Sequence, residues 1–409
     1  MKTKLKLGFA KDLSYNLLAI IIMNIVIQFV IYPYLNRNMG EEAFGNVLYL
    51  LSVVAILANS FGMALNNTRL VIKPQFESRN GDYNVLMVIF CIISCAVAIV
   101  VLHSLDTLTP INGLFFCVLT VLTLIRYYSD VEYRLTLRYR RYFVYYIIIS
   151  IGYLLGIILY KFTKNWFLVL ACGELAAVLF VLPQNTIYQK PFICSKQKAK
   201  VWKITVTVAG SYLIANFFQN IDRIVLQNLM GGDAVTTFYT ASVLGKTVAL
   251  LIGPINGVMI AYLARYSGSF SKGIFSKAVL LAVALSGICF IGCILVSPWL
   301  IRTFYPNVYS TANGLIGIAT LGQILFFTAG LLLAVILRFC HQRYQFTIQI
   351  IYGIVYVALA VPATINMGIE GFAYATLWAN LIRFALVLVV GYKDAGKREI
   401  KEKASNEKQ

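Results

Sequence analysis

The stretch NFFQNIDRIVLQNLMGGDAV, residues 216–235, places two adjacent charges, Asp222 and Arg223, inside a long apolar segment. Ionisable side chains in hydrocarbon are unfavourable by about 2.5–3.5 kcal/mol each on insertion scales, and they usually face a bundle interior or a water-filled cavity. The segment therefore indicates a membrane helix whose charged residues find partners inside the protein.

The composition of the whole chain agrees with a membrane location. Of its 409 residues, 60% are hydrophobic and 12% are charged, and the mean hydropathy is +0.78. A water-soluble domain carries about 25% charged residues. The sequence therefore predicts an all-α integral membrane protein with many spans.

Twelve stretches are nearly free of charge and have the length of about 20 residues that a helix needs to cross a bilayer. Each is predicted to be a membrane helix. They lie near residues 13–36, 43–65, 84–102, 108–125, 142–160, 165–183, 204–230, 234–264, 278–301, 309–337, 344–365 and 369–392.

Lys and Arg residues outside these spans are distributed unequally between the two sides. One side, with both chain ends, holds 28, and the other holds four: Arg37, Lys161, Lys164 and Arg302. Because cytoplasmic loops carry the excess of Lys and Arg, both termini are expected in the cytoplasm. The net charge of +19 is explained by this topology and by attraction to anionic lipids. Since the cations are spread over seven short segments, no nucleic-acid partner is expected.

The two halves of the sequence resemble each other. LNRNMGEEAF at 35–44 aligns with LQNLMGGDAV at 226–235 at an offset of 191, and Gln28 aligns with Gln219 at the same offset. Six crossings separate the two copies, so the repeat is parallel. The pattern predicts two pseudo-symmetric six-helix bundles.

The most polar connection falls between these bundles. We therefore expect an N-terminal six-helix lobe at 1–183, a cytoplasmic linker at 184–203, a C-terminal six-helix lobe at 204–392 and a cytoplasmic tail at 393–409.

Neither a metal site nor an enzyme is predicted. Seven of the eight cysteines lie in or beside apolar spans, and the two histidines, His103 and His341, lie at a helix end and in a loop. The sequence contains no phosphate-binding glycine loop and no Ser/His/Asp set.

The seventh predicted span carries a polar stripe. At about 100° per residue, five of its side chains fall within roughly a 100° arc, while Asp222 lies about 100° from Arg223. We expect Asp222 to pair with a cation on an adjacent helix, with Lys246 as the first choice, and the stripe to face a wet interior. The stripe consists of Asn216, Gln219, Asn220, Arg223 and Gln227.

Asn24, Gln28 and Tyr32 form a shorter stripe in the first predicted span. For the amides of both stripes, hydrogen bonding between helices is an alternative to lining a cavity. At about 1.5 Å per residue, three cations and two carboxylates share one slab near the middle of the membrane. They are Arg223, Lys246, Arg383, Glu174 and Asp222. This positive, amide-rich interior suits an anionic, hydroxyl-rich cargo, because Arg and Lys bind phosphates and amides bind sugars.

Four stretches together resemble the polysaccharide-biosynthesis flippases, the Wzx-type O-antigen or capsule-unit branch of the multidrug/oligosaccharidyl-lipid/polysaccharide (MOP) exporter superfamily. The sequence departs from the pattern in GGDAVTTFYTAS, which lacks the glycine that the first copy has at Gly45. The stretches are YPYLNRNMGEEAFGNVLYL (32–50), NIDRIVLQNLMGGDAVTTFYTASVL (220–244), PINGVMIAYLAR (254–265) and NMGIEGFAYATLWA (366–379).

The resemblance implies a pair of six-helix lobes, as in multidrug (MATE) transporters, around a cationic cavity in the bacterial cytoplasmic (inner) membrane. It implies translocation of an undecaprenyl-pyrophosphate-linked oligosaccharide between leaflets by alternating access. In this reading Arg223 and Lys246 hold the pyrophosphate, Arg383 and Arg126 mark the path to the cytoplasmic mouth, and the amides contact the glycan. Glu174 and Asp222 are structural or coupling charges. No cofactor is expected; coupling to an H⁺ or Na⁺ gradient is open, and membrane lipids and the glycan polymerase or chain-length machinery are expected partners.

Two alternatives stay open. A MATE-like exporter of organic cations has the same fold but calls for a carboxylate-rich cavity. An intramembrane glycan polymerase or acyltransferase is the second alternative.

Overall fold

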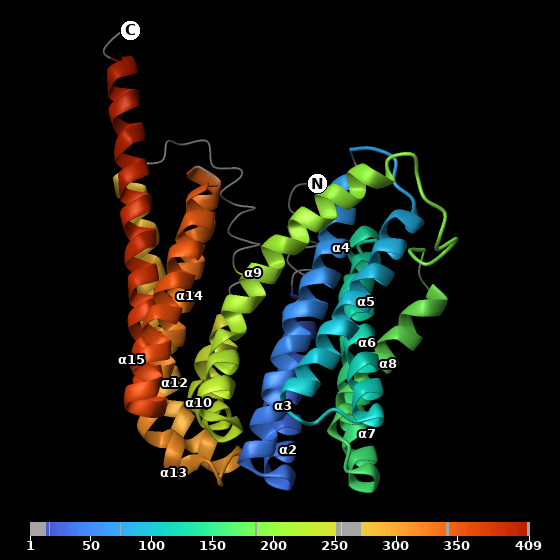
Figure 1. Ribbon diagram of the computed structural model, residues 1–409. Coiled ribbons are helices and arrows are strands. Elements are labelled where there is room, and N and C mark those ends of the chain that lie inside the picture. The colour runs from blue at the N-terminus through green and yellow to red at the C-terminus, as the bar shows by residue number, and fades with distance from the viewer. Residues whose placement is uncertain are drawn as a thin grey trace. The chain divides into compact units, whose positions relative to one another are not determined.

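The computed structural model describes residues 14–15, 17–73, 75–184, 186–250, 255, 271–340 and 343–406, and all regular elements in them are helices (Figure 1). The predicted all-α fold is confirmed. In this part of the chain, nine helices are long and apolar enough to cross a membrane. They are Leu17–Met39, Glu41–Ile72, Asn80–Ser104, Pro110–Leu135, Tyr139–Thr163, Lys198–Met230, Lys272–Phe304, Tyr309–Ile336 and Arg343–Ala395.

Each of the twelve predicted ranges overlaps a helix. The sixth is the shorter helix α8 (Trp166–Val181), and the eighth begins with α10 (Gly232–Ala249), with most of its remainder outside the described residues. The last two predicted spans lie in α15 (Arg343–Asn406), which is interrupted at Gly368, where φ is 61°. Glycine adopts positive φ readily, so Gly368 separates the two crossings.

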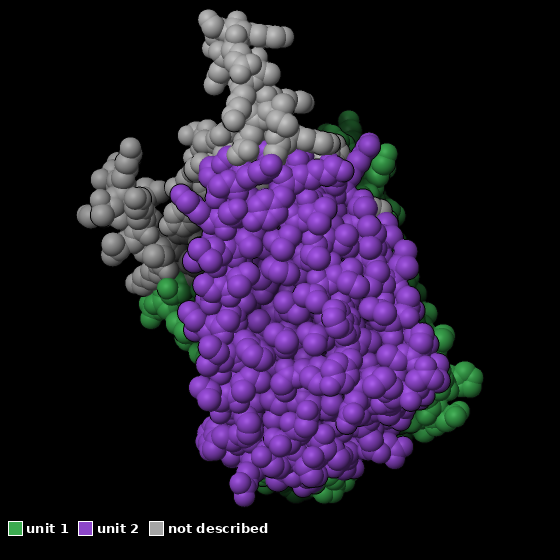
Figure 2. Space-filling model, turned by 90° about the vertical axis from the view of Figure 1, so that its left-hand side faces the viewer, with its two compact units in different colours: residues 1–38, 47–224 green, residues 39–46, 225–409 purple. Residues whose placement is uncertain are grey.

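The chain divides into two compact units, coloured in Figure 2. Unit 1 comprises residues 1–38 and 47–224, and unit 2 comprises residues 39–46 and 225–409. The elements wholly or mostly in unit 1 are η1 (Ile27–Ile31), α2 (Tyr32–Met39), α3 (Glu41–Val54), η2 (Ala55–Asn59), α4 (Ser60–Ile72), α5 (Asn80–Ser104), α6 (Pro110–Leu135), α7 (Tyr139–Thr163), α8, η3 (Leu182–Gln184) and α9 (Lys198–Met230). Those in unit 2 are α10, α12 (Lys272–Phe304), α13 (Tyr309–Ala312), η4 (Asn313–Leu315), α14 (Ile316–Phe339) and α15.

Local sequence signals set several helix ends. At the start of α6, the Thr109 side chain accepts a hydrogen bond from the backbone N–H of Asn112 at 3.1 Å, and Pro110 occupies the first helical position. At the start of α12, Ser271 Oγ accepts one from the backbone N–H of Ile274 at 3.3 Å. These side chains satisfy N–H groups that have no partner within the helix.

In unit 1, α7 and α8 approach each other along a line of glycines. A Cβ on Gly152 would lie 2.7 Å from the Cα of Gly173, and one on Gly156 would overlap the backbone of Val169. Small residues four apart allow membrane helices to pack closely. This packing fixes the helix, α8, that carries Glu174.

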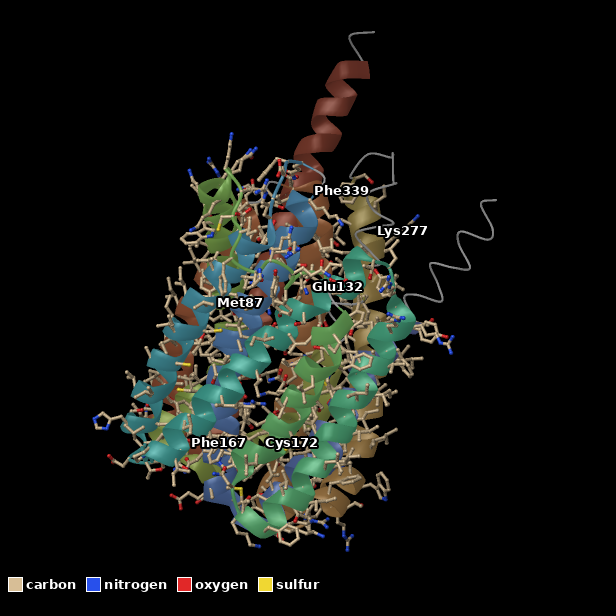
Figure 3. The ribbon with its side chains drawn as sticks, turned by 90° about the vertical axis from the view of Figure 1, so that its right-hand side faces the viewer. Met87, Glu132, Phe167, Cys172, Lys277 and Phe339 are labelled. Atoms are coloured by element: carbon tan, nitrogen blue, oxygen red, sulfur yellow. The ribbon has the colours of Figure 1, made fainter. Side chains whose placement is uncertain are left out.

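In unit 2, α10, α12, α14 and α15 pack around a hydrophobic core. Phe275 of α12 is fully buried against α15, where a Cβ on Gly391 would overlap its ring. Lys277 and Phe339, labelled in Figure 3, lie toward the same end of this unit. The core holds the last helix, which carries Arg383, in place.

Candidate functional site

The polar stripe of α9 meets amide and hydroxyl groups of unit 1. Asn216 is 6% exposed; its Nδ2 donates to Ser60 Oγ at 2.9 Å, and its Oδ1 accepts from Asn59 Nδ2 at 3.1 Å. One turn earlier, the Tyr212 hydroxyl accepts a hydrogen bond from Asn67 Nδ2. Asn216 thus joins α9 to the region where the π-helical turn η2 meets α4.

The other predicted amides differ in their surroundings. Asn220 Nδ2 donates to the Asn216 carbonyl at 2.9 Å, and Asn24 Nδ2 donates to the Ile20 carbonyl at 2.8 Å, so each bonds its own helix. Gln219 is exposed, whereas Gln28 is buried. Gln219 and Asn220 therefore form the more accessible part of the stripe.

Arg223 is half-buried, and its Nη1 donates to the Leu48 carbonyl at 3.3 Å. It also interacts electrostatically with Tyr32. At the offset of 191, Tyr32 is the equivalent of Arg223 in the first copy. Arg223 of one predicted polar stripe therefore interacts with Tyr32 of the other.

Asp222 is 5% exposed and belongs to unit 1, whereas Lys246 is half-buried and belongs to unit 2. The ammonium of Lys246 lies 5.8 Å from the centre of the Tyr239 ring. The pairing of Asp222 with Lys246 stays a prediction.

Two predicted charges, Arg126 of α6 and Glu174 of α8, form a buried ion pair. Arg126 Nε and Glu174 Oε2 are 2.6 Å apart, and each side chain is 4% exposed. The second carboxylate oxygen of Glu174 accepts a hydrogen bond from the Tyr153 hydroxyl at 2.8 Å, and the Arg126 guanidinium lies 4.0 Å from the centre of the Tyr127 ring. Glu174 therefore compensates the charge of Arg126.

Another buried charge on α6, Asp130, was not among the predicted site residues. Its Oδ2 accepts hydrogen bonds from the hydroxyls of Tyr146 at 2.9 Å and Tyr142 at 3.2 Å. Asp130 lies beyond the predicted span at 108–125, but α6 continues to Leu135. Two signals could have revealed the contact: the i,i+4 spacing of the tyrosines and the carboxylate one turn beyond Arg126.

Arg383 of α15 lies among aromatic side chains of unit 2. It is 3% exposed, and its guanidinium carbon lies 4.1 Å from the centre of the Phe326 ring and 5.0 Å from that of Tyr352. Asn380, three residues earlier on the same helix, is 2% exposed.

The segment before α9, which was expected to be a linker, contacts the start of α5. Asn80 Nδ2 donates to the carbonyls of Thr186 at 2.8 Å and Gln189 at 2.6 Å, and Asn84 Nδ2 donates to the Ile187 carbonyl at 3.1 Å.

Further along, Asp82 accepts from the backbone N–H of Ser195 at 2.8 Å, and Glu132 Oε2 accepts from the Thr186 hydroxyl at 3.0 Å. The hydrogen bonds of residues 186–195 with α5 and α6 fix the direction in which α9 begins, and they were not predicted from the sequence. Glu132 lies toward one end of unit 1 and Phe167 toward the other (Figure 3).

The repeat is visible in the backbone of unit 2. Gly40 and Gly231, which are 191 residues apart, have φ values of 86° and 87° and directly precede α3 and α10. Where the first copy has Gly45, the second has Thr236, whose hydroxyl donates to the Glu41 carbonyl at 2.7 Å. The second copy thus has a threonine that makes a hydrogen bond at the position where the first copy has a glycine.

In the part of the chain that the structure describes, no three His, Cys, Asp or Glu side chains gather as a metal site. The charged side chains described above can bind ions and polar ligands through hydrogen bonds and electrostatic attraction.

No family model and no curated protein sequence matches the chain. Several solved structures, however, match its fold. An inward-facing multidrug resistance MATE family transporter of the MOP superfamily has a TM-score of 0.70 at 11% identity, covering 93% of this chain and 95% of that chain. The Vibrio cholerae MATE transporter VcmN in its bent form gives 0.59 at 11% identity, covering 96% and 99%. The lipid II flippase MurJ in an inward closed conformation gives 0.68 at 13% identity, covering 94% and 90%.

The chain is therefore a multi-pass membrane protein with the fold of MOP-superfamily transporters. The solved structures with this fold named above are multidrug transporters and a lipid II flippase.

Proposed function

We propose that the protein is a flippase for an undecaprenyl-pyrophosphate-linked oligosaccharide, a repeat unit of O-antigen or capsule. It moves this lipid from the inner to the outer leaflet of the bacterial cytoplasmic membrane by alternating access. Two findings support the proposal: a fold shared with a lipid II flippase and a cationic, amide-rich helix face on α9.

The face of α9 carries the argument for an anionic glycan. Arg223 is half-buried, Gln219 is exposed and Asn220 is half-buried on the same stripe. A guanidinium forms paired, charge-assisted hydrogen bonds with phosphate oxygens, and amides bond sugar hydroxyls. We assign Arg223 to the pyrophosphate, with Lys246 as its expected partner there, and Gln219 and Asn220 to the glycan.

The buried ion pair indicates a structural role for Arg126 and Glu174. Because Arg126 is compensated by Glu174 at 2.6 Å, we assign the pair to the internal structure of unit 1. Asn216 holds α9 in place through its two hydrogen bonds with Asn59 and Ser60. These assignments leave Arg223, the half-buried cation of the polar stripe, for the cargo.

The proposal includes the wider organisation predicted from the sequence. Both termini are cytoplasmic, the two six-helix lobes rock against each other, and an H⁺ or Na⁺ gradient drives the cycle. The glycan polymerase takes up the cargo on the outer side.

The proposal is tested with purified protein in liposomes that contain a fluorescent undecaprenyl-pyrophosphate oligosaccharide. We expect the label to become accessible in the opposite leaflet while the lipid is chemically unchanged. A changed molecule would identify a polymerase or acyltransferase, and a label that stays in its leaflet would reject the flippase assignment.

A MATE-like multidrug exporter is the second candidate, because MATE transporters share the fold at a TM-score of 0.70. Such a protein would move an organic cation such as ethidium. Two of the buried carboxylates of unit 1, Glu174 and Asp130, already accept hydrogen bonds from protein groups, which disfavours a role of these two in binding cations. Ethidium efflux in the absence of glycan flipping would favour this candidate instead.

A further inference from the structure

Two cationic side chains are fully buried in the described part of the chain, Arg126 and Arg383, each 3% exposed. Their environments differ. Arg126 has a carboxylate 2.6 Å away, in Glu174. Among the described residues no carboxylate pairs with Arg383, and the titratable group that interacts with it electrostatically is Tyr352.

Part of the hydrogen-bonding capacity of Arg383 is also unused within the described residues. Its Nε and Nη1 atoms are buried and have no hydrogen-bond partner there, and the Oδ1 atom of Asn380 is likewise buried without a partner. Buried N–H groups nearly always have a partner, which is protein, ordered water or an ion. A guanidinium also stays protonated in proteins, so it does not lose its charge on burial.

The two aromatic rings account for only part of the stabilisation. Phe326 and Tyr352 lie 4.1 and 5.0 Å from the guanidinium carbon, which is within the range of a cation–π interaction. Ring faces do not accept the in-plane N–H bonds of a guanidinium, and an uncompensated buried charge is strongly destabilising. The edge of the guanidinium therefore calls for a negatively charged acceptor.

We propose that unit 2 binds a small monovalent anion, such as chloride, at the guanidinium edge of Arg383. The anion supplies the negative charge that compensates Arg383, and it accepts hydrogen bonds from the guanidinium N–H groups that lack a partner among the described residues. Asn380 lies three residues earlier on α15, about one helical turn away, so its side chain is on the same face of the helix as Arg383.

The size of the anion follows from the burial. Arg383 is 3% exposed and lies against two rings, so a pyrophosphate carrying a glycan does not reach it. A single-atom anion needs much less space. The site is therefore distinct from the cargo site proposed on α9, and its test is independent of cargo transport.

The test uses the purified full-length protein in detergent at constant ionic strength, because general salt screening then stays the same. The thermal unfolding midpoint is measured by intrinsic fluorescence while sodium chloride replaces sodium gluconate. A ligand that binds only the folded state raises the midpoint in a saturable way. We expect chloride and bromide to raise it and inorganic phosphate to act like gluconate. A midpoint that is equal in chloride and gluconate, or raised equally by phosphate, would overturn the proposal.

Arg383→Gln should abolish the chloride shift, whereas Arg302→Gln, at an exposed position near the end of α12, should retain it. A shift that persists in Arg383→Gln would place the anion elsewhere. If this variant does not fold, calorimetric titration of chloride into the gluconate-exchanged wild-type protein decides the question. One saturable site supports the proposal, and no heat of binding contradicts it.

Discussion

At the scale of single residues, Arg126 and Glu174 show how this protein accommodates charge inside the membrane. Their ion pair is 2.6 Å long, both side chains are 4% exposed, and Tyr153 bonds the second carboxylate oxygen. The partners are 48 residues apart and lie on different helices. The sequence placed Glu174 near the middle of the membrane and Arg126 on the path to the cytoplasmic mouth. Their pairing was not predicted, because it depends on how α6 and α8 pack.

We expect Glu174→Gln to destabilise the protein by about 3–5 kcal/mol, because it leaves Arg126 buried and uncompensated. The thermal unfolding midpoint should fall, and adding Arg126→Met should restore much of the loss. Glu77→Gln is the matched control, since Glu77 is 74% exposed in its ion pair with Arg79, and an exposed pair contributes about 0–1 kcal/mol. Equal midpoints for Glu174→Gln and Glu77→Gln would show that the buried pair has no structural role.

At the scale of helices, most spans were predictable because length and apolarity are properties of a segment by itself. The break at Gly368 and the left-handed glycines Gly40 and Gly231 also follow signals visible in the sequence. The contacts of residues 186–195 with the start of α5 could not be predicted in this way. They depend on long-range hydrogen bonds that Asn80 and Asn84 donate and Asp82 accepts. A polar stretch of this kind looks like a free linker until its partners are known.

The close packing of α7 and α8 leads to a prediction for Gly156. In Gly156→Ala the added methyl group would overlap the backbone of Val169, which cannot rotate away as a side chain can. We expect destabilisation by about 1–3 kcal/mol. Gly210→Ala in α9 is the control, because a Cβ there meets nothing within 4 Å, and the change should stabilise the helix by about 0.5–1 kcal/mol. Unfolding midpoints that move in the same direction in both variants would contradict the packing.

At the scale of the whole molecule, the fold of MOP-superfamily transporters is common to exporters of drugs and to a lipid flippase. The proposed activity of this chain therefore rests on the site and not on the fold. The accessible charge on the polar face of α9 is positive, which favours an anionic cargo.

The predicted orientation is tested by labelling single cysteines in intact cells in a Cys194→Ser background. Lys161→Cys and Asn307→Cys should react with a membrane-impermeant maleimide, because these positions are expected outside, and both are exposed. Lys190→Cys, exposed on the expected cytoplasmic side, should react only after permeabilisation. The reverse pattern would invert the topology.

The most direct test of the central claim is the rate of leaflet exchange of the labelled undecaprenyl-pyrophosphate oligosaccharide in liposomes that contain Arg223 variants. Arg223→Lys should keep partial activity, because an ammonium binds phosphate as a point charge without the paired geometry of a guanidinium. Arg223→Ala and Arg223→Gln should lose exchange at unchanged protein level and unfolding midpoint. If Arg223→Gln flips the lipid as fast as Arg223→Lys, the cation on α9 does not bind the pyrophosphate and the account is wrong.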